Sequence, residues 1–184
     1  MLDFGCGCGR VMRHWRDLRG PALHGTDYNP YLVEWCRAHL SFASFGVNAL
    51  EPPLAYRDAE FDLVYAYSVF THLPAAMQLP WMDELVRVTR VGGHVFLTLH
   101  GESRVVGLGP DERDRFASGE LVVVAADERD WGTNACNAYH PPGWVRDTLA
   151  AGLDLVAHVP ADDSVPQDSY LVRRPAPPPA GTAG

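Results

Sequence analysis

Three glycines stand at every second position near the start of the chain, directly after an acidic residue, in Asp3-Phe4-Gly5-Cys6-Gly7-Cys8-Gly9. Glycine has no Cβ, so a loop of this kind can turn tightly and let bare backbone approach a ligand. The loop follows a short apolar stretch at residues 1–4 and precedes a predicted helix over 11–15. A strand, a glycine loop and a helix in this order form the usual nucleotide-binding turn of an α/β sheet.

The spacing of the glycines and the acidic residue before them limit the kinds of ligand that the loop can bind. The pattern is G-x-G-x-G, whereas dinucleotide-binding folds use G-x-G-x-x-G. Asp3 would repel a pyrophosphate but could bind a cationic ligand. A nicotinamide-dependent oxidoreductase of Rossmann type therefore remains only an alternative, which NADH fluorescence would test. A second acid, Asp27, ends the next apolar stretch, where it could accept bonds from ribose hydroxyls or form an Asx turn with Asn29.

At this point the chain resembles a known family, the class I S-adenosylmethionine (SAM)-dependent methyltransferases. The resemblance covers roughly the first 100 residues, in the order in which the family has them. The matching stretches are Leu2-Asp3-Phe4-Gly5-Cys6-Gly7-Cys8-Gly9-Arg10, Gly25-Thr26-Asp27, Phe61-Asp62-Leu63-Val64-Tyr65-Ala66, Ser68-Val69-Phe70-Thr71-His72-Leu73 and Glu84-Leu85-Val86-Arg87-Val88-Thr89-Arg90-Val91-Gly92-Gly93.

The resemblance implies a Rossmann-like α/β fold with a mostly parallel seven-stranded sheet, a last antiparallel strand and helices on both faces. It implies SAM as the cofactor and methyl transfer to an oxygen or nitrogen of a small molecule. Asp3 and the glycine loop would hold the methionine end and the sugar, Asp27 the ribose, and Asn48 would lie near the adenine. The whole set expected to bind the cofactor is Asp3, Gly5, Cys6, Gly7, Gly9, Asp27, Tyr28, Asn48 and Ser68.

The chain departs from the family pattern in three places. Family members usually have a helix or more before the first strand, so this chain is expected to be truncated at its N-terminus. The turn at Val91-Gly92-Gly93 replaces the usual Pro-Gly-Gly but keeps the glycines that make the turn. Asn48 stands where an aspartate is common; its carbonyl oxygen can still bond the adenine amino group, without charge.

Composition limits the partners and the location. A length of 184 residues and 47% hydrophobic residues suit one domain, expected over 1–174, with a disordered Pro/Ala/Gly-rich tail over 175–184. The net charge of −8 argues against a nucleic-acid substrate. Without a long apolar run or signal peptide, no membrane partner and a cytoplasmic location are expected. The four cysteines match no zinc-site spacing, so no metal is expected. A homodimer is left open.

Short apolar strands alternate with helical patterns, which favours a mostly parallel sheet covered on both faces. Strands are expected at 43–47, 61–67, 94–100, 121–124, 153–159 and 169–173, the last two of antiparallel type. Helices are expected at 31–40, 75–90, 111–118 and 141–151. Residues 48–58 and 125–140 read as loops.

The acceptor should contact loops at the carboxyl ends of the strands, where ligands sit in open α/β sheets. Three histidines there are candidates for a general base. His72 could instead pack near the following helix, His100 could merely end its strand, and His140 belongs to a loop with many aromatic and amide groups. Phe70 and the loop residues Trp131 and Tyr139 are expected to form the substrate wall, although a surface loop would explain them too.

One further alternative lies outside enzymes altogether. A chain that lost its N-terminal cover could be a non-catalytic, methyltransferase-like module that binds a partner or nothing. An upstream in-frame extension with a helical pattern would favour the active enzyme.

Overall fold

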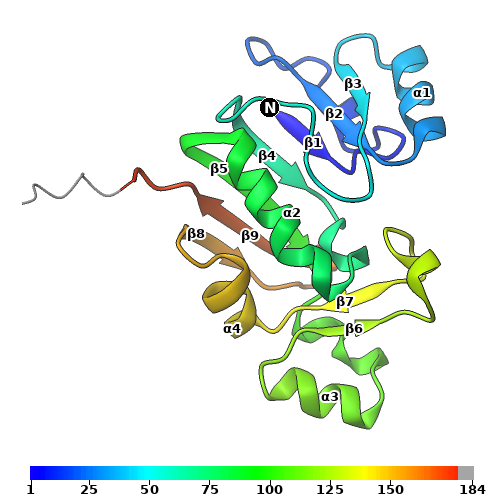
Figure 1. Ribbon diagram of the computed structural model, residues 1–184, viewed down its shortest axis with the longest axis vertical. Coiled ribbons are helices and arrows are strands. Elements are labelled where there is room, and N and C mark those ends of the chain that lie inside the picture. The colour runs from blue at the N-terminus through cyan, green and yellow to red at the C-terminus, as the bar shows by residue number, and fades with distance from the viewer. Residues whose placement is uncertain (178–184) are drawn as a thin grey trace, which may run out of the picture.

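The computed structural model describes residues 1–177 and contains one seven-stranded sheet, in the order β3-β2-β1-β4-β5-β9-β8 (Figure 1). Of the predicted tail, residues 178–184 lie outside the described part. The strands of this sheet are β1 (Leu2–Phe4), β2 (His24–Asp27), β3 (Ser44–Val47), β4 (Phe61–Ala66), β5 (Thr89–Leu99), β8 (Asp154–Val159) and β9 (Asp168–Arg173).

The direction of the strands confirms the predicted sheet. Strands β1 to β5 pair in parallel, whereas β9 pairs antiparallel with both β5 and β8. The chain runs from β1 outward to β2 and β3, then returns to β4 on the other side of β1. The strand order reverses between β1 and β4, and open α/β sheets bind ligands at the carboxyl ends of the strands at such a point.

Helices cover the two faces of the sheet. Helix α2 (Ala75–Val88) and the turn of α4 (Pro142–Trp144) lie in front of the sheet in Figure 1. They enclose the larger hydrophobic cluster, which includes Leu2, Phe4 and Trp81. A second cluster forms among the glycine loop, a short 3-10 helix (Met12–Trp15) and α1 (Pro30–His39). The connections from β1 to β2 and from β2 to β3 progress across the sheet in the direction opposite to the connection through α2. Because crossovers between parallel strands are right-handed, these two connections lie on the face of the sheet opposite to α2.

Local sequence fixes the start of α1. The Asn29 side chain accepts hydrogen bonds from Tyr31 N and Leu32 N at 3.0 and 3.4 Å, and Pro30 occupies the first helical position. An asparagine cap followed by proline satisfies the free N–H groups of a helix N-terminus. The sequence therefore starts this helix directly after Asp27 and holds that residue at the edge of the sheet.

The segment between β5 and β8 departs most from the sequence prediction. It contains α3 (Pro110–Ala117) and a small antiparallel pair of β6 (Val122–Val124) and β7 (Asn137–Tyr139). The prediction of a loop throughout 125–140 was wrong at β7. Three residues are too few to show an alternating pattern, and their pairing depends on a distant strand.

Other boundaries shift by a few residues. Helix α2 ends at Val88, and β5 begins at Thr89, so the strand starts before its predicted position at 94. The predicted helix after Pro141 forms, with its second half wound as a π-helical turn over Val145–Leu149. Within the described residues, no helix is long and apolar enough to cross a bilayer.

Candidate functional site

The glycine loop leaves β1 in a left-handed conformation. Gly5 and Gly7 have φ values of 74° and 54°, which side chains rarely adopt. The N–H groups of Gly5 and Cys6 both donate to the carbonyl of Thr26, at 2.8 and 3.0 Å. The loop is thereby fastened to the end of β2. A Cβ on Gly7 would meet no atom within 4 Å, so open space lies over this residue.

Asp27 joins the glycine loop to the start of α1. It lies at the end of β2 and is 7% exposed. One carboxylate oxygen accepts from Gly7 N at 2.8 Å and the other from Asn29 N at 2.9 Å. Each oxygen retains a lone pair for a further donor. The Asx turn and a ligand-binding role are therefore compatible in this geometry.

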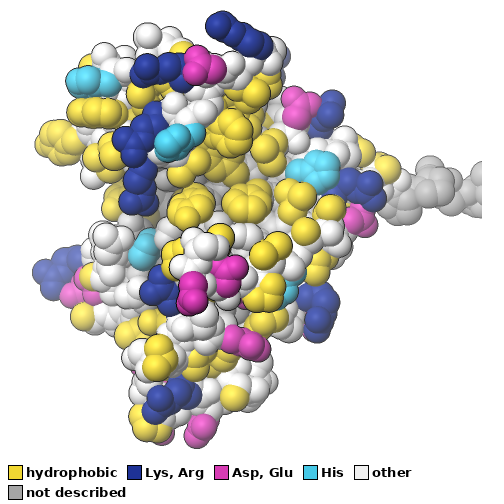
Figure 2. Space-filling model, turned by 180° about the vertical axis from the view of Figure 1, so that it is seen from behind, with side chains coloured by type: hydrophobic (Ala, Val, Ile, Leu, Met, Phe, Trp, Pro, Cys, Tyr) yellow, Lys and Arg dark blue, Asp and Glu magenta, His cyan; other side chains and the backbone are white. Residues whose placement is uncertain are grey.

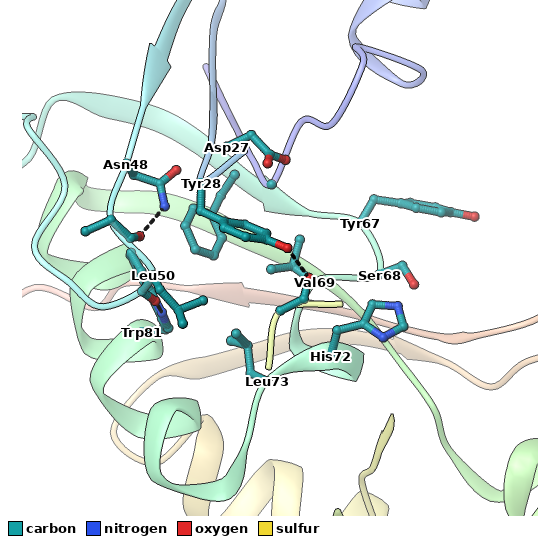
Figure 3. A pocket seen from close by; sticks show the side chains of 14 residues that line it. Asp27, Tyr28, Asn48, Leu50, Tyr67, Ser68, Val69, His72, Leu73 and Trp81 are labelled. Atoms are coloured by element: carbon teal, nitrogen blue, oxygen red, sulfur yellow. Dashed lines mark hydrogen bonds between the residues drawn. The ribbon is translucent and has the colours of Figure 1, made fainter. Parts of the chain in front are cut away.

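A cavity of about 120 Å³ lies beside Asp27 at the carboxyl ends of β1, β2 and β4 (Figure 3). Asp27, Tyr28 and Asn48 lie along one side, and Ser68 and His72 along the other. A second pocket, of about 430 Å³, lies over the glycine loop and shares Gly5 and Tyr67 with the first. The two pockets therefore adjoin one another, and together they are of the size that small-molecule ligands occupy.

The side chains of Tyr28 and Asn48 already make hydrogen bonds. The Tyr28 hydroxyl donates to the carbonyl of Gly132 at 3.1 Å, which ties the segment after Trp131 to the cavity. The Asn48 oxygen accepts from the Thr26 hydroxyl at 2.8 Å, and its amide donates to Ala49 O. One lone pair of the Asn48 oxygen stays free for another donor.

Asp3 carries a buried carboxyl group with an unused oxygen. Its side chain is 2% exposed and borders the pocket over the glycine loop. Its Oδ2 has no hydrogen-bond partner among the described residues, and neither do the Tyr65 hydroxyl and Trp15 Nε1. The pKa of Asp3 is raised to about 7, mainly by burial and to a lesser extent by the charge of Asp27. A cation brought to this pocket would restore the charged form.

Ser68 adopts strained backbone at the end of β4. Its φ of 59° is unusual for a residue with a side chain. A closed set of hydrogen bonds holds it there: Ser68 N donates to Thr98 Oγ1 (2.8 Å), Thr98 Oγ1 to Gln167 Oε1 (2.6 Å), and Gln167 Nε2 to Ser68 Oγ (2.7 Å). Thr98 and Gln167 are buried. The loop before β9 therefore positions the rim of the cavity.

Replacing Thr98 with valine is expected to lower the free energy of unfolding by about 1–3 kcal/mol, because Ser68 N and Gln167 Oε1 would lose a buried partner. Urea denaturation measures the change. Thr98→Ser keeps the hydroxyl and is the matched control. Equal losses in the two variants would show that the methyl group, rather than the hydrogen bonds, carries the effect.

The three candidate histidines occupy different environments. His72 lines the cavity, and its Nδ1 lies 2.8 Å from the carbonyl of Cys136. A carbonyl only accepts, so Nδ1 carries the hydrogen and Nε2 is free to accept a proton. His100 packs edge-on to His72, with ring centroids 6.3 Å apart. The pKa of His100 is lowered to about 4, mainly by burial and to a lesser extent by Arg104 and His72.

His140 and Phe70 require correction, because both are fully buried. His140 Nε2 lies 3.2 Å from Gln78 Oε1, and burial lowers its pKa to about 3. The Gln78 amide in turn donates to the carbonyls of Phe70 and Leu73. His140 therefore joins β7 to α2 inside the core, out of reach of a substrate. The side chain of Phe70 belongs to the large hydrophobic cluster rather than to the cavity wall.

The remaining predicted residues lie near the cavity, but not all of them line it. Trp131 packs partly buried against the large core cluster, and its neighbour Gly132 lines the cavity and donates to His72 O at 2.8 Å. Tyr139 packs its ring 5.5 Å from His100. Gly9 is needed for packing, because a Cβ there would lie 2.3 Å from a Leu40 methyl carbon.

Sequence reasoning missed several lining residues. Tyr67 and Gly132 border the cavity, and Leu50 and Trp81 form its apolar end. Tyr67 could have been inferred, since it ends the strongest predicted strand. The others come from loops and a helix without a local signal. Within residues 1–177, no three His, Cys, Asp or Glu side chains are grouped to hold a metal ion.

Comparison with known proteins supports the fold. Residues 2–97 match the family model described as a methyltransferase domain. A curated malonyl-[acyl-carrier protein] O-methyltransferase from Serratia marcescens is 30% identical over 143 residues, which cover 76% of this chain and 52% of the relative. The chain therefore spans about half the length of that relative.

Solved structures agree with this result. A SAM-dependent methyltransferase from Methanosarcina mazei superposes with a TM-score of 0.71 at 15% identity, covering 95% of this chain and 91% of the other. The 1,6-didemethyltoxoflavin-N1-methyltransferase of Burkholderia thailandensis gives 0.67 at 13% identity, covering 95% and 70%. The expected Rossmann-like methyltransferase fold is thus confirmed.

Proposed function

This chain belongs to the methyltransferase domain family, and on that basis we propose that it binds SAM and transfers the methyl group to an oxygen or nitrogen atom of a small molecule. One observation carries the proposal. The Asp27 carboxylate accepts from the N–H of Gly7, and the two residues border adjoining pockets, of which the one at Gly7 also reaches Asp3 with its unpaired carboxyl oxygen.

The residues around this space fit the chemical groups of SAM. Asp3 offers an unused buried oxygen, which suits the cationic amino group of the methionine part. Gly7 exposes backbone where a side chain would fill the space, whereas a Cβ on Gly5 would lie 2.4 Å from a Val69 methyl carbon. Asp27 would accept hydrogen bonds from the ribose hydroxyls, and Asn48 with Tyr28 would border the adenine. Cys6 and Gly9 would shape the loop, and Ser68 would close the far side.

When bound, SAM supplies an electrophilic methyl group with a good leaving group. The protein then has to orient the acceptor and exclude water. His72 is the better candidate for a base, because Cys136 O fixes its tautomer and leaves Nε2 free. The low pKa of His100 keeps it neutral at pH 7, and its ring packs against His72 rather than lining the cavity, so it would position His72 rather than take a proton from the acceptor.

Calorimetry with SAM and with S-adenosylhomocysteine (SAH) tests the cofactor site, and SAH release over a panel of acceptors tests turnover. We expect micromolar binding, equivalent to about −8 kcal/mol. The panel includes malonyl thioesters, because the Serratia relative is named a malonyl-[acyl-carrier protein] O-methyltransferase. Binding without turnover would favour the non-catalytic module. A version extended at the N-terminus is measured beside this chain, and absence of binding in both would overturn the proposal.

Replacing Gly7 with alanine is expected to weaken SAM binding at least about tenfold, because the new methyl group would enter the open space over the loop. Gly92→Ala is the matched control. Gly92 also has a positive φ, 75°, and open space at its Cβ position, but it lies in the turn before the paired part of β5. Both variants should lose about 1 kcal/mol of stability from backbone strain, which urea denaturation measures. Equal SAM affinity in both would contradict the proposed cofactor contact.

A further inference from the structure

A third pocket, of about 510 Å³, adjoins the cofactor space. It lies between the 3-10 helix after the glycine loop and the loop before β9. It shares Tyr67 and Ser68 with the cavity at Asp27, and Arg10 with the pocket over the glycine loop. A molecule held in it would therefore lie next to the proposed cofactor.

The charged side chains of this pocket are all basic. Arg10 and His14 line one wall. Arg104 does not line the pocket, but it donates through Nε to the carbonyl of Pro166, a residue of the other wall, at 3.0 Å. No carboxylate lines this pocket among the described residues. In Figure 2, basic and histidine side chains gather at the upper left of the molecule, above the indentation between its two halves.

This local charge is opposite to that of the whole chain, whose net charge is −8. Some arginines elsewhere, such as Arg90 and Arg173, pair with carboxylates at 2.8 Å, whereas others in the described part of the chain, such as Arg113, stand unpaired on the surface outside these pockets. Within residues 1–177 the Arg10 guanidinium makes neither an ion pair nor a hydrogen bond. A basic pocket on an acidic protein concentrates anionic ligands and speeds their association.

We propose that this basic pocket binds an anionic group of the methyl acceptor, a carboxylate or a phosphate, through Arg10 with support from His14, while Arg104 adds positive charge behind the wall at Pro166. The proposal rests on the function proposed above and names the class of its substrate. The planar guanidinium can bind both oxygens of such a group, which an ammonium or a hydroxyl cannot do. Tyr67 adds a hydroxyl at the border with the cofactor space.

The test uses malonate and inorganic phosphate as probes of the two anion types. Each is titrated by calorimetry at low ionic strength into protein saturated with SAH, and into protein alone. The variants are Arg10→Gln and Arg104→Gln. Arg113→Gln is the matched control, because Arg113 is an exposed arginine on α3 without an ion pair in the described part of the chain.

We expect millimolar binding of at least one anion, weakened about tenfold by Arg10→Gln and less by Arg104→Gln, with no effect of Arg113→Gln. SAH affinity should change less than about threefold in Arg104→Gln and Arg113→Gln. Arg10 also lines the pocket over the glycine loop, so in Arg10→Gln the loss of anion binding should exceed any loss of SAH affinity. Preference for malonate assigns a carboxylate, and preference for phosphate assigns a phosphorylated acceptor.

Two results would overturn the proposal. One is absence of anion binding to the wild-type protein. The other is a loss of SAH affinity in Arg10→Gln with anion binding unchanged, which would assign Arg10 to the cofactor. Failure of SAH to bind the wild-type protein is a separate result, and it would reject the proposed function. If the protein alone then still bound the anion, the pocket would be an anion site that is unrelated to methyl transfer.

Discussion

Replacing Asp27 with alanine is expected to abolish detectable SAM binding, a loss of at least about 100-fold. Two effects add together in this variant. The proposed hydrogen bonds to the ribose disappear, and hydrogen bonds to a charged group contribute about 1.5–3 kcal/mol each. In addition, Gly7 N and Asn29 N lose their acceptors, so the glycine loop and the start of α1 lose their link. Calorimetry with SAM and SAH measures the loss.

Two controls separate binding from folding. Asp62→Ala removes an exposed ion pair with Arg90 and should leave SAM affinity unchanged. Asp27→Asn keeps one acceptor oxygen and should bind with intermediate affinity. If Asp27→Ala remained folded by circular dichroism and bound SAM as tightly as wild type, the ribose assignment would be wrong.

Replacing Asp3 with asparagine is expected to change stability and binding in opposite directions. The pKa of Asp3 is raised to about 7, mainly by burial. Between about pH 4 and 7 the folded protein therefore holds a proton that the unfolded chain has released, and the free energy of unfolding falls as pH rises. The amide of asparagine is neutral at every pH, so the variant does not lose this free energy of unfolding as pH rises. We expect Asp3→Asn to be more stable than wild type at pH 8 by about 1–4 kcal/mol.

The same substitution should weaken SAM binding at pH 8 by about 10–100-fold, because the amide cannot pair with the cationic amino group. In the wild type, affinity should rise about tenfold from pH 6 to pH 8 as Asp3 ionises, and this rise should disappear in the variant. Calorimetry at several pH values and urea denaturation of the ligand-free protein give both quantities. A variant that lost stability at pH 8, or retained full affinity, would contradict the assignment.

The sequence predicted the parts of the fold and site that have a local signal. The glycine loop and Asp27 follow from strand ends and from residues that tolerate a tight turn. Strand β4 follows from a continuous apolar run. Gln167 and Gly132 could not be predicted, because they reach the cavity region from distant loops through hydrogen bonds. His140 was assigned to the wrong environment, since its burial depends on packing against Gln78 of α2.

The two proposed ligands draw on different parts of the chain. Residues proposed for the cofactor lie before Ser68 or at it, whereas the acceptor pocket also uses His14 and two residues of the loop between β8 and β9, Pro166 and Gln167. Gene duplicates of such a protein would exchange acceptors by substitutions at His14 and in that loop while the cofactor strands stay unaltered. Among residues 1–177, four positions border both spaces, namely Arg10, Val11, Tyr67 and Ser68, and these would be the slowest to diverge.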